Sequence, residues 1–383
     1  MKKKKLRSKD WFDNPKDPGL TALYLERYLN YGLTRKDLQS GKPIIGIAQS
    51  GSDLSPCNRH FLKLSEHIRR GIKEAGGVPM EFPTHPIQET GKRPTAALDR
   101  NLSYLSLVEV LYGYPLDGVV LTTGCDKTTP AALMAAATVN IPAIVLSGGP
   151  MLDGHYKGKK AGSGTIIWEA RKLYSKGEIN YDEFMDMATA SSPSVGHCNT
   201  MGTASTMNSI AEALGMSLPG SAIIPAPYPE RKTVSYKTGR RIVGMVKENL
   251  TPSKIMTKKA FENAVVVASA IGGSSNATTH LIAIAKQMGI KFNLTDWQKL
   301  GHKIPLLVNC QPAGEHLMEG FYRAGGVPGV MKELIKNKKL NTKVMTVTGK
   351  KLGENIRSKI KINTDVIKNF ENNLTEHAGF LVL

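Results

Sequence analysis

LDGVVLTTGCDKTTPAALMAAATVNIPAIVLSGG, residues 116–149, is the stretch that decides the fold. An apolar run of strand length at 116–124 leads into a loop, a helix is expected to open at Pro130, and a second apolar run follows at 141–149. Strand, loop, helix and strand in this order is typical of a parallel α/β sheet, in which ligands collect at the carboxyl ends of the strands. The sequence therefore predicts an α/β fold.

The same pattern extends in both directions from this stretch. PIIGIAQS (43–50) predicts a further strand, and HFLKLSEHIRRGIKEAGG (60–77) predicts a helix because its apolar residues recur every three or four positions before a Gly stop. After residue 160 the pattern becomes mainly helical, and PLLVNCQP (305–312) is expected to return to the sheet. We expect a three-layer domain with a mainly parallel sheet flanked by helices and a helix-rich second half.

Length and composition allow a large core and suggest three regions. The chain has 383 residues, of which 41% are hydrophobic, so one large domain or two smaller ones are possible. Residues 1–40 are polar and aromatic without steady periodicity, and we expect an N-terminal arm that packs on a neighbour or on the domain surface. Residues 41–360 form the predicted α/β domain, and residues 361–383 follow as a separate segment.

Charge and hydropathy disfavour two classes of partner. The net charge of +19 raises the question of nucleic acid, but the lysines are dispersed and no nucleic-acid motif accompanies them. The most apolar stretches, 134–146 and 264–273, are too short or too interrupted to span a bilayer, and the basic start has no apolar stretch behind it. We expect no nucleic-acid partner, no membrane partner, and a cytoplasmic location with reduced thiols.

Three of the four cysteines stand alone in Gly-, Pro- and Thr-rich turns: Cys57 in SDLSPCNRH, Cys125 in LTTGCDKTTP and Cys198 in SVGHCNTMGTAST. They are either unrelated small buried residues or three ligands of one centre, brought together by the fold. Cys310 ends a strand-like run and fits the first interpretation. A zinc ribbon or finger is disfavoured because no C-x-x-C pair occurs. Three thiolates without a fourth suit a metal centre that keeps one position open.

Side chains that carry oxygen or nitrogen atoms stand next to two of these cysteines in the sequence. Asp126 and Lys127 follow Cys125 directly, which places a hard-metal ligand and a cation at a helix N-terminus. Alternatively, Asp126 caps that helix and Lys127 pairs with a carboxylate. His197, beside Cys198, is a candidate active-site group. The remaining histidines considered are expected on helices or at their ends: His60, His67, His280 and His302.

Two long motifs resemble a known family. GCDKTTPAALMAAATVNIPAIVLSGGPMLDG and GHCNTMGTASTMNSIAEALGMSLPGS are similar to the two signature regions of the iron–sulfur dehydratases that include dihydroxy-acid dehydratase and phosphogluconate dehydratase. MEFPTHPIQETGKRPTAALDRNLSYL and the GCDKTTP loop resemble the sugar-acid branch, which acts on arabinonate or xylonate. The resemblance runs from about residue 40 to the end of the chain.

The resemblance implies two metal groups. Cys57, Cys125 and Cys198 would ligate a [2Fe–2S] cluster that leaves one iron unsaturated. Glu89, Asp126 and Lys127 would serve a nearby Mg²⁺ site, with the lysine acting as its carbamate. Without the motif around it, Glu89 would read as an ordinary surface carboxylate.

The resemblance also implies a reaction. It predicts a sugar-acid dehydratase, a carbon–oxygen lyase that removes water from a 2,3-dihydroxy acid such as L-arabinonate or D-xylonate to give a 2-keto-3-deoxy acid. The alternatives are the dihydroxy-acid dehydratase of branched-chain amino-acid synthesis and, from another class, a non-catalytic iron–sulfur redox protein or an inactive fragment. Expected partners are a small-molecule sugar acid and, in a homo-oligomer, further copies of the chain.

The family pattern continues into a β-rich C-terminal domain that carries another Mg²⁺ ligand and the base for C2. ENNLTEHAGFLVL, at the end of residues 361–383, resembles a linker and the opening strand of that domain. We therefore expect the isolated chain to be inactive or incomplete, and a separate chain carrying the C-terminal domain is a further possible partner.

Overall fold

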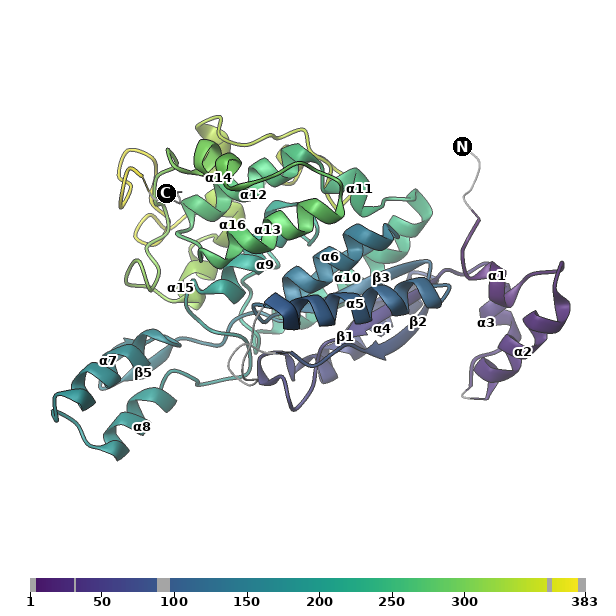
Figure 1. The fold of residues 1–383 in the computed structure, drawn as a ribbon, viewed down its shortest axis with the longest axis horizontal. Coiled ribbons are helices and arrows are strands. Elements are labelled where there is room, and N and C mark those ends of the chain that lie inside the picture. The colour runs from purple at the N-terminus through teal and green to yellow at the C-terminus, as the bar shows by residue number, and fades with distance from the viewer. Residues whose placement is uncertain (1–4, 31, 88–96, 357–359, 378–383) are drawn as a thin grey trace.

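The core of the molecule is a four-stranded parallel sheet (Figure 1). The computed structural model describes residues 5–30, 32–87, 97–356 and 360–377. The strands lie in the order β2-β1-β3-β4, and Ile45 of β1 stands opposite Gly118 of β3. The strand bounds are β1 Ile44–Gln49, β2 Val78–Pro83, β3 Gly118–Thr123 and β4 Ala143–Ser147. The α/β fold with a mainly parallel sheet is confirmed.

Burial explains which strands the sequence predicted. Every residue of β1, β3 and β4 is buried, so these strands read as continuous apolar runs, and all three were predicted. The edge strand β2 was missed. Its sequence contains Pro79 and Pro83, and only its first two residues are buried, so it has no continuous apolar run.

Helices cover both faces of the sheet and create the predicted three layers. On one face α4 (Phe61–Glu74) and α10 (Pro229–Glu248) pack on each other and on the strands. A β-carbon on Gly71 would come within 2.2 Å of the Tyr236 carbonyl oxygen, and one on Gly239 within 2.2 Å of the Ile68 carbonyl oxygen, so these helices touch backbone to backbone. On the other face lie α5 (Ala97–Gly113) and α6 (Thr128–Val139).

The second half is helix-rich, as predicted. Helix α9 lies at its centre, with all eleven of its residues buried, and packs against α6, α12, α13 and α16. The bounds are α9 Thr203–Ala213, α11 Pro252–Ile255, α12 Lys258–Ala270, α13 Asn276–Gln287, α14 Leu294–Gly301, α15 Met318–Arg323, α16 Gly326–Lys336 and α17 Leu352–Asn355. None of the described helices combines the length and the apolar character needed to cross a bilayer.

The expectation that 305–312 returns to the sheet is wrong. The segment forms isolated bridges and joins neither of the sheets that the described residues form. The bridges pair Leu306 with Thr375, Val308 with Ile367 and Cys310 with His316. Its apolar residues are buried among helices, and a short apolar run of this kind does not distinguish a strand from other buried backbone. Residues 378–383, the last six of the thirteen residues expected to open the C-terminal domain, lie outside the described residues.

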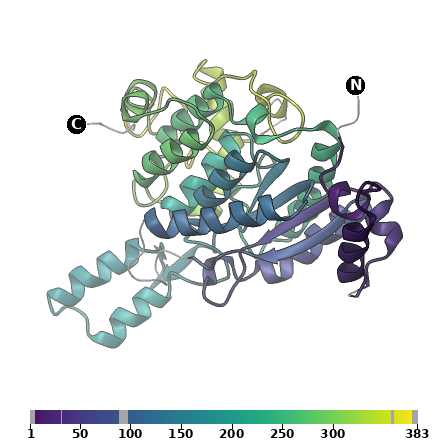
Figure 2. The same ribbon diagram turned by 45° about the vertical axis from the view of Figure 1, so that its right-hand side comes forward.

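A helical hairpin projects from the body (Figures 1 and 2). Its small core is separate from the main one and consists of Ala161, Ile166, Ala170 and Met187. Asn180 begins its second helix with a capping box to Glu183, in which each side chain accepts from the other residue's backbone N–H. The elements are β5 Gly154–Tyr156, β6 Lys159–Ala161, α7 Thr165–Ser175 and α8 Tyr181–Thr189.

The N-terminal arm packs on its own domain. It contains α1 (Lys9–Phe12), α2 (Pro18–Leu29) and α3 (Arg35–Gln39). The Arg7 guanidinium donates to the Leu116 carbonyl oxygen at 3.1 Å, and the Ser8 backbone N–H donates to the Asp117 carboxylate at 3.2 Å. These bonds tie the arm to the entry of β3.

Candidate functional site

The predicted cysteines lie in loops that lead into helices around one cavity. Cys57 lies in the 3-10 turn after β1, Cys125 lies between β3 and α6, and Cys198 lies shortly before α9. All three line a cavity of about 810 Å³, and Asp126 lines it with them. The loops after β1 and β3 meet because carboxyl ends of neighbouring parallel strands share one edge of the sheet.

The thiols of Cys57 and Cys125 interact directly. The hydrogen bond between them lowers the pKa of Cys57 and raises the pKa of Cys125, and burial raises the latter further. Cys57 is therefore the more readily ionised of the two, and a thiolate is the form of cysteine that binds metals. Cys310 does not line this cavity; its Sγ lies 3.8 Å from the Leu317 carbonyl oxygen, and burial raises its pKa.

Asp126 and Lys127 form a buried pair at the start of α6. Lys127 Nζ donates to Asp126 Oδ2 at 2.6 Å, and Cys125 Sγ donates to Asp126 Oδ1 at 3.0 Å. The Asp126 side chain is 3% exposed and the Lys127 side chain is 8% exposed, so the pair is largely removed from water. The N-cap residue of α6 is Lys127, and it makes no side-chain cap bond, so the alternative in which Asp126 caps the helix is not observed. The other alternative, an ion pair between Lys127 and a carboxylate, is present.

Asn208, which the sequence analysis did not single out, joins the Cys125 and Cys198 loops. From the buried face of α9 its amide donates to the Gly124 carbonyl oxygen at 3.0 Å and lies 3.3 Å from His197 Nε2. Its Oδ1 accepts from Thr129 Oγ1 at 3.1 Å and from Thr123 Oγ1 at 3.3 Å. No clear sequence signal marks it, because Asn208 is one of several polar residues on α9, among them Ser205, Thr206 and Ser209.

His197 lies behind the cavity and does not line it. It is fully buried; Nδ1 donates to the Cys198 carbonyl oxygen at 2.9 Å, which leaves Nε2 to accept from Asn208. Burial lowers its pKa to about 3. This geometry holds the Cys198 loop in place, and a catalytic role for His197 stays a prediction.

The other predicted site residues have mixed outcomes. Glu89 lies outside the described residues. His60 stands at the N-cap of α4, His67 lies within α4, and His280 and His302 lie in and just after their helices, as predicted. Within the described ranges, no three His, Cys, Asp or Glu side chains are gathered closely enough to hold a single metal ion.

The possible metal ligands nevertheless fall into two chemical types, thiols and a carboxylate. Thiols approach the cavity from three loops, and the Asp126 carboxylate faces the same space. Thiolates suit iron–sulfur clusters, whereas carboxylates suit Mg²⁺. A two-iron cluster distributes its ligands over two metal atoms, so its thiolates need not surround one point. The donor types therefore fit both implied groups.

Hydroxyl groups line the side of the cavity formed by the base of the projecting hairpin. Ser163 lies just before α7, and Ser192 and Ser194 follow α8. Ser194 Oγ accepts from the Leu152 N–H at 2.9 Å and donates to the Val195 carbonyl oxygen at 3.0 Å, while Ser192 is exposed. A wall of this kind suits a ligand with several hydroxyl groups.

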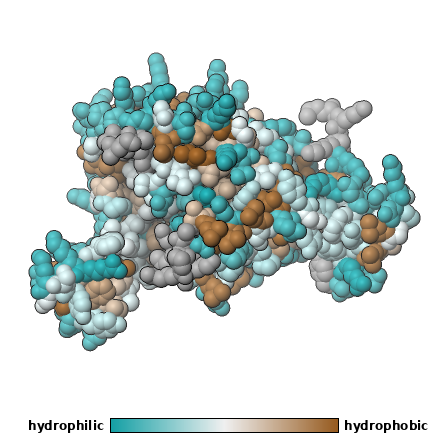
Figure 3. Space-filling model, in the orientation of Figure 1, coloured by the Kyte–Doolittle hydropathy of each residue, from teal (hydrophilic) through white to brown (hydrophobic). Residues whose placement is uncertain are grey.

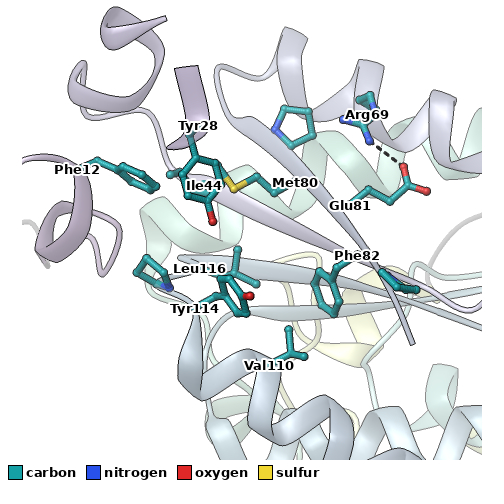
Figure 4. Close-up of a pocket in the computed structure, with 13 residues that line it drawn as sticks. Phe12, Tyr28, Ile44, Arg69, Met80, Glu81, Phe82, Val110, Tyr114 and Leu116 are labelled. Carbon is teal, nitrogen blue, oxygen red and sulfur yellow. Dashed lines mark hydrogen bonds and ion pairs between the residues drawn. The ribbon is translucent and has the colours of Figure 1, made fainter. Parts of the chain in front are cut away.

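A second cavity, of about 540 Å³, lies between the N-terminal arm and the sheet (Figure 4). Phe12 and Tyr28 of the arm face Met80 of β2 across it, and the lining is mainly apolar and aromatic. Its charged pair, Arg69 and Glu81, is already joined at 2.8 Å. None of the four cysteines lines this cavity, so the candidate chemistry belongs to the first one.

Comparisons with known proteins show the family to which the chain belongs. The sequence model of the dihydroxy-acid/6-phosphogluconate dehydratase N-terminal family matches residues 42–355. D-xylonate dehydratase of Caulobacter vibrioides is 58% identical over 380 residues, which are 99% of this chain and 64% of that protein. L-arabinonate dehydratase of Rhizobium leguminosarum is 45% identical over 388 residues, covering 100% of this chain and 66% of that protein.

A relative with lower identity is named as a different dehydratase. Dihydroxy-acid dehydratase of Caldanaerobacter subterraneus is 39% identical over 362 residues, which are 93% of this chain and 65% of that protein. The chain thus spans between 64% and 66% of the length of these three curated relatives.

Proposed function

This chain belongs to the dihydroxy-acid/6-phosphogluconate dehydratase family, and from that premise we propose that it carries the cysteine-bearing part of a sugar-acid dehydratase. Such a hydro-lyase removes the C2 proton and the C3 hydroxyl of a 2,3-dihydroxy acid, and the resulting enol becomes a 2-keto-3-deoxy acid. The observation that carries the proposal is the meeting of Cys57, Cys125, Cys198 and Asp126 at one cavity.

The proposed cofactors are a [2Fe–2S] cluster and Mg²⁺. Cys57, Cys125 and Cys198 would hold the cluster, and Asp126, Lys127 as its carbamate, and Glu89 would hold the magnesium ion. When bound, these groups would supply Lewis acidity toward the departing hydroxyl and the substrate carboxylate. The lowered pKa of Cys57 supports this proposal, because it favours the thiolate form that binds iron.

The chain's own residues would orient the substrate and limit water. The burial of Asp126 and Lys127 strengthens their electrostatic interactions, because nearby water would otherwise screen them. Asn208 and His197 would keep the Cys125 and Cys198 loops at a fixed separation. Positioning of this kind supplies much of the rate enhancement in enzymes.

The proposed substrate is a pentonate such as D-xylonate or L-arabinonate. The hydroxyl-lined wall at Ser163, Ser192 and Ser194 supports a polyol chain, because a site that hydrogen-bonds hydroxyl groups rejects analogues that lack them. The relatives named as D-xylonate and L-arabinonate dehydratases also have higher identity than the one named as dihydroxy-acid dehydratase. That activity is the alternative function.

Assembly into a homo-oligomer is also proposed. Leu98, Leu102, Leu105 and Tyr112 recur at helical spacing on the outer face of α5 and are between 46% and 66% exposed. Figure 3 shows apolar side chains gathered over this helix. A contiguous exposed apolar face supports burial against another polypeptide. Light scattering of the wild-type chain and a Leu102→Glu variant tests this: a monomer in both would contradict it.

Anaerobic reconstitution of the full chain with iron, sulfide and Mg²⁺ tests the function. We expect visible cluster absorption, and 2-keto-3-deoxy product from D-xylonate or L-arabinonate in preference to product from 2,3-dihydroxyisovalerate. Each assay is run alone and with a polypeptide equivalent to the remaining third of the Caulobacter relative. The reverse preference would favour the dihydroxy-acid dehydratase. A reducible cluster without product from any acid would favour a redox protein.

A further inference from the structure

A buried histidine on α13 has one ring nitrogen in a hydrogen bond and the other without a partner among the described residues. His280, on α13, is 3% exposed, and its Nδ1 lies 3.0 Å from Arg100 Nη1 on α5. Helix α13 packs on α6, and the charges of Lys127 and Asp126 both act on the imidazole. The ring therefore lies near the N-terminal end of α6, although the sequence separates it from Arg100 by 180 positions.

The contact with Arg100 determines where the imidazole proton is. A guanidinium has only donors, so His280 Nδ1 must accept the hydrogen bond and the neutral ring carries its proton on Nε2. That Nε2 is buried and has no hydrogen-bond partner among the described residues. A buried N–H without an acceptor is a net cost to the folded state. The structure thus holds a donor prepared for an acceptor that is not part of the described protein.

The surrounding charges indicate what kind of acceptor it is. Three charged groups act on His280: the cations Arg100 and Lys127 and the anion Asp126. The hydrogen bonds of Arg100 run to neutral groups, His280 and Asn101, so they do not offset its charge. Lys127 and Asp126 pair with each other at 2.6 Å, whereas Arg100 is 5% exposed and bonds no carboxylate among the described residues. A buried cation of this kind favours an anionic oxygen, since a buried charge is costly unless it is paired.

We propose that His280, oriented by Arg100, donates its Nε2–H to a carboxylate-type oxygen held near the Asp126–Lys127 pair. The inference rests on the proposed function only in taking that pair as the place of carboxylate chemistry. His280 is then a binding residue, and Arg100 is a positioning residue that acts through it.

Two sources can supply this oxygen. One is the carboxylate of the sugar acid. The other is a carbamate on Lys127: the amine, after losing one proton to solvent, attacks carbon dioxide, a C–N bond forms, one C–O π pair moves onto oxygen, and the second proton leaves the nitrogen for solvent. Both present a planar group with negative charge shared by two oxygens, so the same donor serves either one.

The direct test observes the proton itself. The full chain is prepared with ¹⁵N-labelled histidine, and the Nε2–H resonance of His280 is followed by NMR. One sample receives D-xylonate in carbon-dioxide-free buffer, and another receives ¹³C-bicarbonate without xylonate. We expect a proton on Nε2 from the start, and a downfield shift with slower solvent exchange in at least one sample, which identifies the source. A proton on Nδ1, or no change in either sample, would overturn the inference.

Variants measure what the hydrogen bond contributes. His280→Leu removes a hydrogen bond to a charged acceptor, so it should weaken binding of whichever ligand shifts the resonance, D-xylonate or bicarbonate, roughly 10- to 100-fold. His280→Gln retains an N–H donor and should recover most of the lost affinity. His302→Leu is the matched control, because His302 also has a buried nitrogen without a partner but stacks on His377. Unchanged affinity in folded His280→Leu would contradict the inference.

Two further outcomes separate this inference from the proposed function. If His280→Leu does not fold, as judged by circular dichroism, the NMR measurement on the wild-type chain still decides. If the Nε2–H resonance responds to a ligand while no cluster or product forms, the proposed function fails and the assignment of His280 stands.

Discussion

Replacement of Asn208 by leucine should loosen the loops that carry Cys125 and Cys198. Asn208 makes four hydrogen bonds outside its own helix turn, to Gly124, His197, Thr123 and Thr129. Leucine has a similar size but neither donates nor accepts, so these buried partners lose a bond each. The change therefore tests the connection between α9 and the cavity without removing a proposed metal ligand.

The expected magnitude follows from those bonds. A buried hydrogen bond contributes about 1 kcal/mol net, so four of them give about 4 kcal/mol. Two of the four are long, at 3.3 Å, and the leucine side chain returns about 1 kcal/mol through apolar burial. We expect Asn208→Leu to lower the free energy of unfolding by about 2 to 3 kcal/mol, measured by urea titration with circular dichroism.

Two measurements show whether the loss is local. Cys125 is 4% exposed in the folded chain, so its alkylation by a maleimide requires the loop to open. We expect faster alkylation of Cys125 in Asn208→Leu, quantified by peptide mass spectrometry with buried Cys310 as the internal reference. The matched control is Asn263→Leu, because Asn263 is equally buried but bonds Asn341 at 2.7 and 3.0 Å, away from the cavity.

The control separates local from global effects. Asn263→Leu should lower stability by about 1 kcal/mol, from two lost hydrogen bonds less the leucine's apolar burial, without selectively exposing Cys125. The reasoning is refuted if Asn208→Leu keeps wild-type stability, or if Cys125 reacts no faster in it than in Asn263→Leu at matched stability.

Three further predictions concern the cavity and the residues around it. Serine in place of each cavity cysteine should abolish the visible absorption of the reconstituted cluster, whereas Cys310→Ser should retain it; equal loss in all four would contradict the proposed ligand set. Lys127→Arg preserves the charge but cannot form a carbamate, so calorimetry should show Mg²⁺ affinity reduced roughly 10-fold or more; wild-type affinity would exclude the carbamate role. Burial lowers the pKa of His197 from 6.5 to about 3, so the unfolded chain binds a proton that the folded chain does not, and stability should fall as pH drops below about 6.5 toward 3, at up to about 1.4 kcal/mol per pH unit from this residue. His197→Asn should reduce that slope in urea titrations across this range, and an unchanged slope would show that other groups cause it.

The sequence alone was sufficient to predict those strands of the sheet that are buried along their whole length. Strands β1, β3 and β4 are buried throughout, so their apolar runs stand out in any reading of the chain. Helix α4 was equally clear, because one of its faces is apolar and the other is not. Two predictions failed for opposite reasons. Edge strand β2 was missed because it lacks an apolar run, and segment 305–312 was wrongly assigned to the sheet because it has an apolar run but no partner strand.

Tertiary structure decided how the site is assembled. Turn context separated Cys57, Cys125 and Cys198 from Cys310, but only the parallel arrangement of β1 and β3 and the position of α9 bring the three to one cavity. The pairing of Arg100 with His280 depends on α5 and α13 both packing on α6, a relation between segments 180 residues apart. Local sequence encodes helix and strand because periodicity acts over a few residues, whereas such contacts depend on how whole elements pack, which no local pattern records.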